Sequence, residues 1–199
     1  MKPLNKINST AVPIKIENID TDQIIPARFL KAISREGFGE NLFRDWRFDQ
    51  ENQPIEDFIL NDKTYSGKII VTGQNFGCGS SREHAAWAIK DYGFDVVISS
   101  YFADIFKGNA LNNGILPIVV DEDILQTIFS EIEKNPNIEF SIDVENQVLE
   151  FNEYNIYFEI DPYKKICLIN GYDDMDYLLS QLDKIEAYEQ QKTKTYENI

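Results

Sequence analysis

The chain has 199 residues and an ordinary globular composition, with 43% hydrophobic and 27% charged residues. Its 19 basic and 34 acidic residues give a net charge of −15, which argues against binding to nucleic acid or to an anionic membrane surface. No apolar stretch is long enough to span a membrane, and two cysteines, Cys78 and Cys167, cannot build a disulfide framework. These features favour a cytoplasmic protein with reduced thiols.

The first third of the chain has little regular periodicity. A strand is expected at residues 12–16, and the long segment 18–61 that follows is rich in arginine, phenylalanine and tryptophan. A loop of this length in a compact domain is usually functional or disordered, and the aromatic content argues against disorder. We therefore expect segment 18–61 to be partly ordered and to cover a substrate or partner site.

The middle of the chain alternates between strand and helix patterns. Short apolar runs predict strands, and apolar residues at helical spacing predict helices. The expected strands are 68–72, 95–99 and 115–120, and the expected helices are 81–92, 102–111 and 121–134. This order predicts a largely parallel sheet with flanking helices, and Pro117 places the third strand at an edge or a strand end.

The last third follows a different pattern. Apolar residues alternate with period two in residues 138–160, which predicts short antiparallel strands in a second layer. A final helix is expected at 173–188, and a polar, flexible tail at 190–199. The whole chain, 1–199, is thus expected to be a single α/β domain.

Residues 73–87 carry the chemistry of the chain. They lie between an expected strand and an expected helix, where ligands bind in open α/β sheets. Glycines 73, 77 and 79 let backbone amides approach a ligand, and the start of the helix offers partial positive charge. Arg82 adds a guanidinium that fits a carboxylate or a phosphate. The segment therefore predicts an anion site.

Two nucleotide motifs fail in this segment. A dinucleotide fingerprint that starts at Gly77 requires glycine where Arg82 stands, and a phosphate loop that starts at Gly73 requires glycine where Cys78 stands. A small organic anion is therefore the favoured ligand.

Several residues here also have a purely structural interpretation. Ser80 and Glu83 have the spacing of a capping box at the start of the helix. Cys78 is either a small half-buried residue or a thiol whose pKa is lowered by the helix. His84, the single histidine, is expected to pack or to support the site indirectly, and Cys167 to lie in the core. One histidine excludes a multi-histidine metal site.

Several motifs along almost the whole chain resemble the small subunits of 3-isopropylmalate dehydratase, which match the swivelling C-terminal domain of the aconitase family. The strongest carrier is Asn75-Phe-Gly-Cys-Gly-Ser-Ser-Arg-Glu-His-Ala85. Others are Asn18-Ile-Asp-Thr-Asp-Gln-Ile-Ile-Pro26, Arg28-Phe-Leu-Lys31, Gly37-Phe-Gly39, Asp45-Trp-Arg-Phe48, Tyr92-Gly-Phe94, Phe102-Ala-Asp-Ile-Phe106 and Asn113-Gly114.

The resemblance implies a three-layer β/β/α swivelling domain and a division of labour between two subunits. A large subunit would hold a [4Fe–4S] cluster, and this chain, with two cysteines, would bind no metal or cofactor itself. The implied activity is the interconversion of 2-isopropylmalate and 3-isopropylmalate by dehydration and rehydration in leucine biosynthesis. The substrate is thus a small hydroxy-dicarboxylate.

Site residues are carried over by position from the same family. Ser80 resembles the catalytic base, Arg82 the residue that holds a substrate carboxylate and stabilises the serine alkoxide, and Ser81 a further carboxylate ligand. Such a base requires nearby positive charge, because serine at its ordinary pKa is a poor base.

Residues Pro26 to Ala32 align with the specificity loop of the family. Phe29 and Leu30 offer apolar surface for an isopropyl group, and either Arg28 or Lys31 meets a carboxylate. Asp20 and Asp22 are interpreted as residues that order this loop rather than as catalytic groups.

Two alternatives remain open. The chain could serve homoaconitase or a related hydroxy-diacid dehydratase, since relatives differ mainly in the specificity loop. It could also be a non-catalytic module that binds a small anion, which would not require a base at Ser80.

Overall fold

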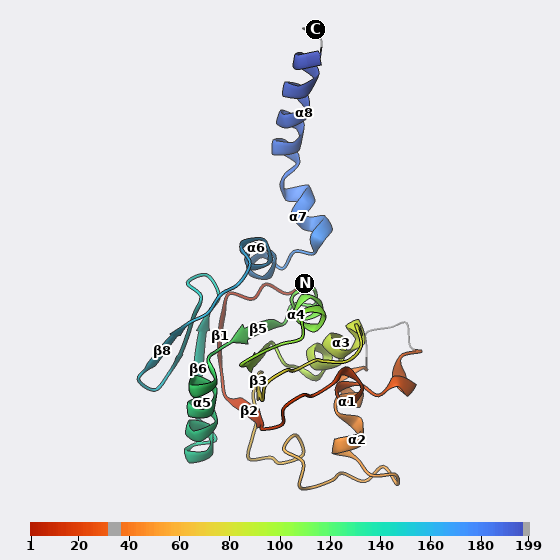
Figure 1. The fold of residues 1–199 in the computed structure, drawn as a ribbon, viewed down its shortest axis with the longest axis vertical. Coiled ribbons are helices and arrows are strands. Elements are labelled where there is room, and N and C mark those ends of the chain that lie inside the picture. The colour runs from red at the N-terminus through yellow and green to blue at the C-terminus, as the bar shows by residue number, and fades with distance from the viewer. Residues whose placement is uncertain (32–36, 197–199) are drawn as a thin grey trace.

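The computed structural model describes residues 1–31 and 37–196 of the chain. Two sheets and a set of helices form a compact body, from which the last two helices project as an arm (Figure 1). Within the described residues, no helix combines the length and the hydropathy that a membrane span requires.

A four-stranded parallel sheet with the order β2-β3-β4-β5 forms the central layer. Its strands are β2 (Ala11–Ile14), β3 (Ile69–Thr72), β4 (Val96–Ser99) and β5 (Leu116–Val119). The three strands predicted in the middle of the chain are confirmed, and the strand expected at 12–16 is β2. Both edge strands carry a proline, Pro13 and Pro117. Because the Leu116 amide donates to the Asp95 carbonyl oxygen, the adjacent Pro117 nitrogen points away from β4, to the unpaired side of β5.

Helices cover both faces of the parallel sheet. On one face, α3 (Glu83–Tyr92) and α4 (Asp104–Asn112) pack alanine, isoleucine and phenylalanine side chains against Ile70 and Val97. On the other face, α5 (Glu122–Lys134) buries Leu125 and Ile128 in the same core as Ile69. The alternation of side chains along each strand divides the core into these two clusters.

An antiparallel sheet with the order β1-β6-β7-β8 forms the second layer. Its strands are β1 (Lys6–Ser9), β6 (Phe140–Asp143), β7 (Val148–Phe151) and β8 (Tyr154–Tyr157). Ile142 and Leu149 from this sheet share the core that contains Ile69 and α5. The predicted β/β/α architecture is confirmed, although β1 is not among the predicted strands.

Short elements occupy the described part of segment 18–61. They are α1 (Thr21–Ile24), α2 (Arg44–Arg47) and two 3₁₀ turns, η1 (Ala27–Phe29) and η2 (Gly39–Asn41). The Phe43 ring stacks on Trp46 at 5.3 Å between ring centroids, and Phe58 packs against both. Ala32, the last residue of the predicted specificity loop, lies outside the described residues.

The C-terminal part differs from the prediction. Helix α6 (Pro162–Asn170) was not predicted, although Asp161 caps it and Pro162 opens it. The expected single helix at 173–188 is two helices, α7 (Asp174–Ser180) and α8 (Leu182–Tyr196), which meet at Gln181. Cys167 is buried on α6, as predicted for a core residue.

Candidate active site

The loop that follows β3 pairs with the segment that precedes α1. The Gly77 amide donates to the Ile19 carbonyl oxygen at 2.8 Å, and the Thr21 amide donates to the Cys78 carbonyl oxygen at 2.9 Å. These hydrogen bonds join two parts of the chain that are about sixty residues apart, and they place residues 18–22 beside the glycine-rich loop.

Gly77 lets the loop approach helix α4. Its φ angle is +76°, and a Cβ atom at this position would lie 2.2 Å from Cγ of Phe106. Only glycine fits here without displacing the Phe106 ring. The close contact fixes the loop against α4 and so determines where the residues after it lie.

Ser80 and Ser81 are exposed on the outer part of this loop. The Ser80 amide and carbonyl oxygen both hydrogen-bond the Thr21 hydroxyl, each at 3.2 Å. Among the described residues, no hydrogen bond engages the Ser80 hydroxyl. The backbone of Ser80 is therefore fixed, while its hydroxyl faces solvent.

The predicted capping box is wrong. Helix α3 begins at Glu83, and its N-cap residue is Arg82, with no side chain capping the helix end. The Ser80 backbone is tied to Thr21, and Glu83 accepts a hydrogen bond from the Asn113 side-chain amide at 3.1 Å. Since no side chain caps α3, the positive end of the helix dipole remains available to an anionic ligand.

Arg82 forms an ion pair with Asp22 from α1. The Arg82 side chain is 19% exposed, whereas the Asp22 side chain is 53% exposed. The guanidinium is thus held near the loop by a carboxylate that faces solvent. The sequence around Asp22 predicts only a loop-ordering residue, and no local pattern indicates this pairing.

Arg28 forms a second ion pair of the same kind with Asp45 of α2. One of its two hydrogen bonds measures 2.9 Å, and the guanidinium lies 4.7 Å from the centroid of the Phe29 ring. The Arg28 hydrogen bonds hold the pKa of Asp45 below its ordinary value. Arg28 and Phe29 line a cavity of about 680 Å³ together with Arg44, Asp45, Phe48, Asp49, Gln50, Asn52 and Ile55.

The predicted site residues form two groups, and no direct interaction connects these groups among the described residues. Ser80, Ser81 and Arg82 lie together on one loop, beside Thr21 and Asp22. Leu30 packs against the core cluster under α3, and Lys31 is exposed. Within the described residues, no hydrogen bond or ion pair links the group Arg28–Lys31 to the group Ser80–Arg82.

The remaining candidates have structural roles. Burial and the nearby Asp20 carboxylate raise the pKa of the Cys78 thiol, so a thiolate lowered in pKa by the helix is not supported. The His84 ring packs between Phe38 and Trp87, with centroids 5.5 and 4.5 Å away, as expected for a packed histidine. Asp20 caps α1 with Gln23 in a capping box, which confirms its loop-ordering role.

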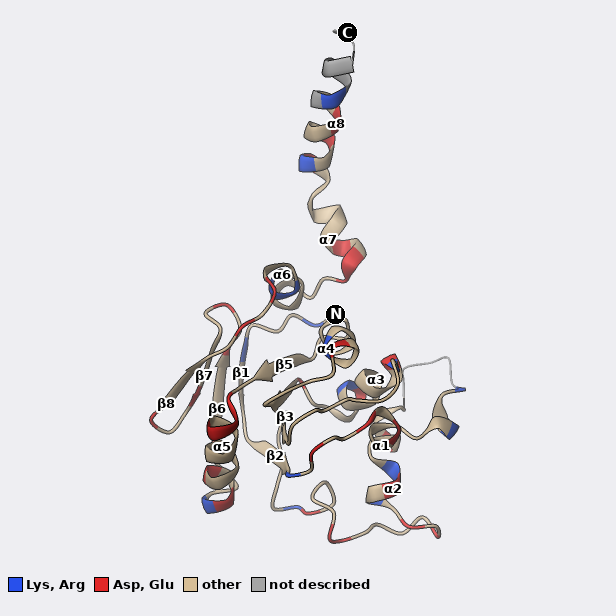
Figure 2. Ribbon diagram, in the orientation of Figure 1, with Lys and Arg blue, Asp and Glu red and all other residues tan. Residues whose placement is uncertain are grey.

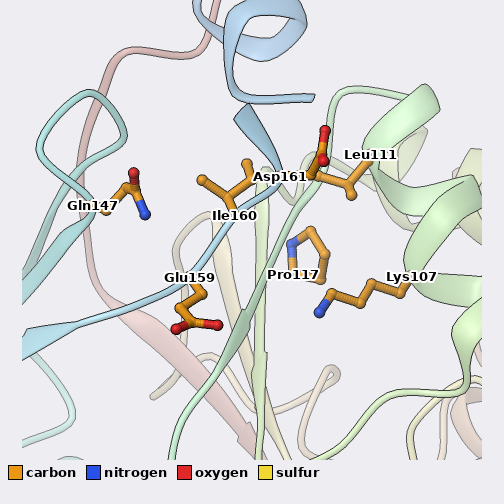
Figure 3. Close-up of a pocket in the computed structure, with 7 residues that line it drawn as sticks. All are labelled: Lys107, Leu111, Pro117, Gln147, Glu159, Ile160 and Asp161. Atoms are coloured by element: carbon orange, nitrogen blue, oxygen red, sulfur yellow. The ribbon is translucent and has the colours of Figure 1, made fainter. Parts of the chain in front are cut away.

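A second cavity, of about 370 Å³, lies where α4 and β5 face residues 159–161 (Figure 3). Lys107, Glu159 and Asp161 provide charged groups around it, and Leu111, Pro117 and Ile160 provide apolar walls. None of the predicted site residues lines this cavity. Across the described parts of the chain, no cluster of three His, Cys, Asp or Glu side chains is arranged to hold a metal ion.

Comparison with known proteins decides the family. The model of the aconitase C-terminal domain matches residues 1–123, which include the loop with Ser80 and Arg82. The 3-isopropylmalate dehydratase small subunit of Christiangramia forsetii is 60% identical over 201 residues, covering 100% of this chain and 98% of its own. The corresponding small subunit of Cytophaga hutchinsonii is 58% identical, covering 98% of each chain. This chain belongs to the family of 3-isopropylmalate dehydratase small subunits.

The fold of the family supports the same assignment. The crystal structure of 3-isopropylmalate dehydratase from Methanocaldococcus jannaschii matches with a TM-score of 0.64 and 28% identity, covering 94% of this chain and 99% of that chain. The domain match ends at Asp123, so β6–β8 and helices α6–α8 lie beyond it. The small-subunit relatives, in contrast, match almost from end to end.

Proposed function

We propose that this chain is the small subunit of a 3-isopropylmalate dehydratase, which interconverts 2-isopropylmalate and 3-isopropylmalate in the cytoplasm as a step of leucine biosynthesis. The observation that carries the proposal is the arrangement of Ser80 and Arg82. Ser80 has an exposed side chain and a backbone held by hydrogen bonds to Thr21. Two residues later, the largely buried side chain of Arg82 lies at the start of α3, which no side chain caps.

Ser80 and Arg82 divide the work of the reaction in this proposal. Arg82 binds a substrate carboxylate with its planar fork, and Ser81 donates a further hydrogen bond to it. The Ser80 oxygen accepts the proton from the carbon beside that carboxylate during dehydration and returns a proton during rehydration. The guanidinium and the α3 dipole stabilise the negative charge on the Ser80 oxygen and on the reacting carbon.

Asp22 adjusts the strength of carboxylate binding. Its carboxylate already occupies part of the Arg82 guanidinium, so a substrate carboxylate must share or displace it. The ion pair holds the Arg82 side chain against α1 before substrate arrives, which reduces the conformational entropy lost on binding.

The substrate side chain is recognised by residues Arg28 to Lys31 in this proposal. Phe29 and Leu30 provide apolar contact with the isopropyl group, and either Arg28 or Lys31 contacts the second carboxylate. No hydrogen bond or ion pair joins these residues to Ser80 and Arg82 among the described residues, so in this proposal the substrate itself contacts both groups.

The [4Fe–4S] cluster that the family implies does not fit this chain. Its two cysteines lie on different elements, and Cys167 is buried on α6, whereas cluster ligation requires several thiolates around one centre. We therefore assign the cluster to a large subunit, and we assign to this chain only the base and the carboxylate-binding groups.

Reconstitution tests the function directly. Purified chain is added to a cluster-loaded large subunit, and the unsaturated intermediate formed from isopropylmalate is followed by ultraviolet absorbance, with each subunit alone as a control. Turnover is expected only in the mixture and only with isopropylmalate. Turnover with homocitrate or citrate instead would assign a different diacid. Carboxylate binding without any turnover, in the presence of a verified partner, would overturn the enzymatic role in favour of an anion-binding module.

A further inference from the structure

The C-terminal arm, formed by α7 and α8, leaves a row of large apolar side chains uncovered. Met175, Leu178, Leu179, Leu182 and Ile185 each keep between 38% and 63% of their surface exposed. On α7, Leu178 and Leu179 lie three and four residues after Met175, and on α8 Ile185 lies three residues after Leu182, so each helix carries its apolar side chains on one face. We call these five residues the arm stripe. Figure 1 shows the arm pointing away from the body, so the body does not cover this stripe.

Helices α7 and α8 meet at Gln181. The Gln181 amide donates to the Leu178 carbonyl oxygen at 3.0 Å, which closes α7, and the Ile185 amide donates to the Gln181 carbonyl oxygen at 3.1 Å, which opens α8. Gln181 therefore belongs to the last turn of one helix and the first turn of the next. The two helices follow one another away from the body (Figure 1), so the apolar side chains of α7 and of α8 belong to one projecting arm.

Specific contacts fix the base of the arm to the body. Asp174 accepts hydrogen bonds from the Tyr163 hydroxyl and, at 3.2 Å, from the Lys164 ammonium. The Tyr177 ring packs edge-on against Tyr163, with 4.5 Å between centroids. Asp173 starts α7 with a capping box. The side of α7 that carries Tyr177 is thus bound to the body, while the arm stripe is left open.

Charge decides between two occupants of the stripe. Acidic residues gather at the start of α7, whereas α8 carries Lys184 and Lys192 beside Asp183, Glu186 and Glu189 (Figure 2). Along the arm as a whole, acidic residues outnumber the lysines. A second copy of this chain, itself carrying a net charge of −15, would bring the same excess of carboxylates against the arm. A partner with an apolar groove and a basic rim would instead match both the arm stripe and this acidic excess.

We propose that the arm stripe is the docking surface for the large subunit, which binds it in an apolar groove bordered by lysine or arginine. The inference rests on the proposed function, because that function requires a large subunit. A helix of about fifteen residues is marginally stable alone in water, so docking would also stabilise α8. The contacts of Asp174 and Tyr177 hold the arm in position before the partner arrives.

Binding measurements on the full chain test this surface. Leu178→Asp/Leu182→Asp introduces two charges into the arm stripe, whereas Ser180→Asp/Ala187→Asp introduces two charges away from it on the same helices. With purified large subunit in a titration calorimeter, we expect the stripe variant to bind at least about 30-fold more weakly than wild type, and the control to bind within about threefold. Affinity of the wild type should fall as salt concentration rises.

The outcomes separate the two proposals. Equal affinity of both variants would overturn the docking surface while leaving the enzymatic function intact. Failure of the wild-type chain to bind a verified large subunit would overturn the partnership itself. Sedimentation equilibrium of the isolated chain supplies the remaining test: a dimer that the stripe variant abolishes would assign the stripe to a second copy. Circular dichroism should show matching helix content in both variants.

Discussion

The guanidinium of Arg82 donates to the carboxylate of Asp22, a residue 60 positions earlier in the sequence. This contact brings the glycine-rich loop and helix α1 together at the candidate active site. The Asp22 carboxylate thus occupies the Arg82 guanidinium, to which we assign the binding of a substrate carboxylate. The same arrangement recurs at Arg28 and Asp45. In the free chain, both arginines of the predicted site are therefore paired with an aspartate.

Replacement of Arg82 by lysine should remove most of the turnover. Lysine can still pair with Asp22 as a point charge, so the fold should survive, but it cannot offer the two parallel N–H groups that a carboxylate binds. We expect kcat/KM in the reconstituted enzyme to fall about 100-fold or more, which corresponds to the loss of a charge-assisted hydrogen bond. The melting temperature of the isolated chain serves as the control. Wild-type turnover in Arg82→Lys would contradict the assigned role.

Ser80→Ala and Ser81→Ala should distinguish the catalytic base, Ser80, from Ser81, which only binds the substrate carboxylate. Both serines are exposed, and the Ser80 hydroxyl makes no hydrogen bond among the described residues, so stability should change by less than about 0.5 kcal/mol. Ser80→Ala should abolish turnover at any substrate concentration. Ser81→Ala should mainly raise KM. Comparison of kcat and KM for the two variants checks the assignment, and equal effects on both parameters would refute it.

Gly77→Ala should destabilise the chain through a steric clash. The added Cβ would lie 2.2 Å from Phe106 Cγ, and the φ of +76° is unfavourable for alanine. We expect a loss of about 3 kcal/mol in the free energy of unfolding. Gly108, within α4, is the matched control because nothing lies within 4 Å of its Cβ position. Gly108→Ala should stabilise by about 0.5–1 kcal/mol, since alanine favours a helix. Urea unfolding measures both variants.

Asp143 should make stability depend on pH at acidic values. Hydrogen bonds from the Asn146 amide and side chain, with Lys6 nearby, lower the pKa of Asp143 to about 2. A lowered folded-state pKa means that the stabilisation is present above the unfolded pKa, near 3.9, and is lost as pH falls toward 2. The stability difference between wild type and Asp143→Asn should therefore shrink over this range. Urea midpoints at pH 5 and pH 2.5 test this, with the exposed Glu139→Gln as a control.

Short-range sequence patterns predict the strands of the parallel sheet that lie in the middle of the chain, together with the helices that follow them. The strands at 69–72, 96–99 and 116–119 and the helices that follow them have continuous apolar runs or clear helical spacing. Helix α6 also has local signals, namely Asp161-Pro162 at its start and Gly171 after its end, although its apolar pattern alone does not predict a helix. The period-two pattern predicts β6–β8. Strand β1, in contrast, forms by pairing with β6, which is more than 130 residues away in the sequence.

Contacts between distant segments limited the prediction of the site. The serine–glutamate spacing predicted a capping box, yet the Thr21 hydroxyl binds the Ser80 backbone and the helix begins at Glu83 instead. Asp22 and Asp45 gave no local signal of their arginine partners, since an ion pair across 60 or 17 residues depends on tertiary structure. The positions of Ser80, Ser81 and Arg82 on one loop followed directly from the sequence, whereas their surroundings did not.

Proline on both edge strands of the parallel sheet has a consequence for how the chain behaves when it is concentrated. An exposed edge can recruit a strand from another molecule, which is a common route to aggregation. Pro13 in β2 and Pro117 in β5 each remove a hydrogen-bond donor from an edge. A further strand added at either end of the parallel sheet would therefore leave one hydrogen bond of the new ladder unmade, which disfavours growth of this sheet from one molecule to the next.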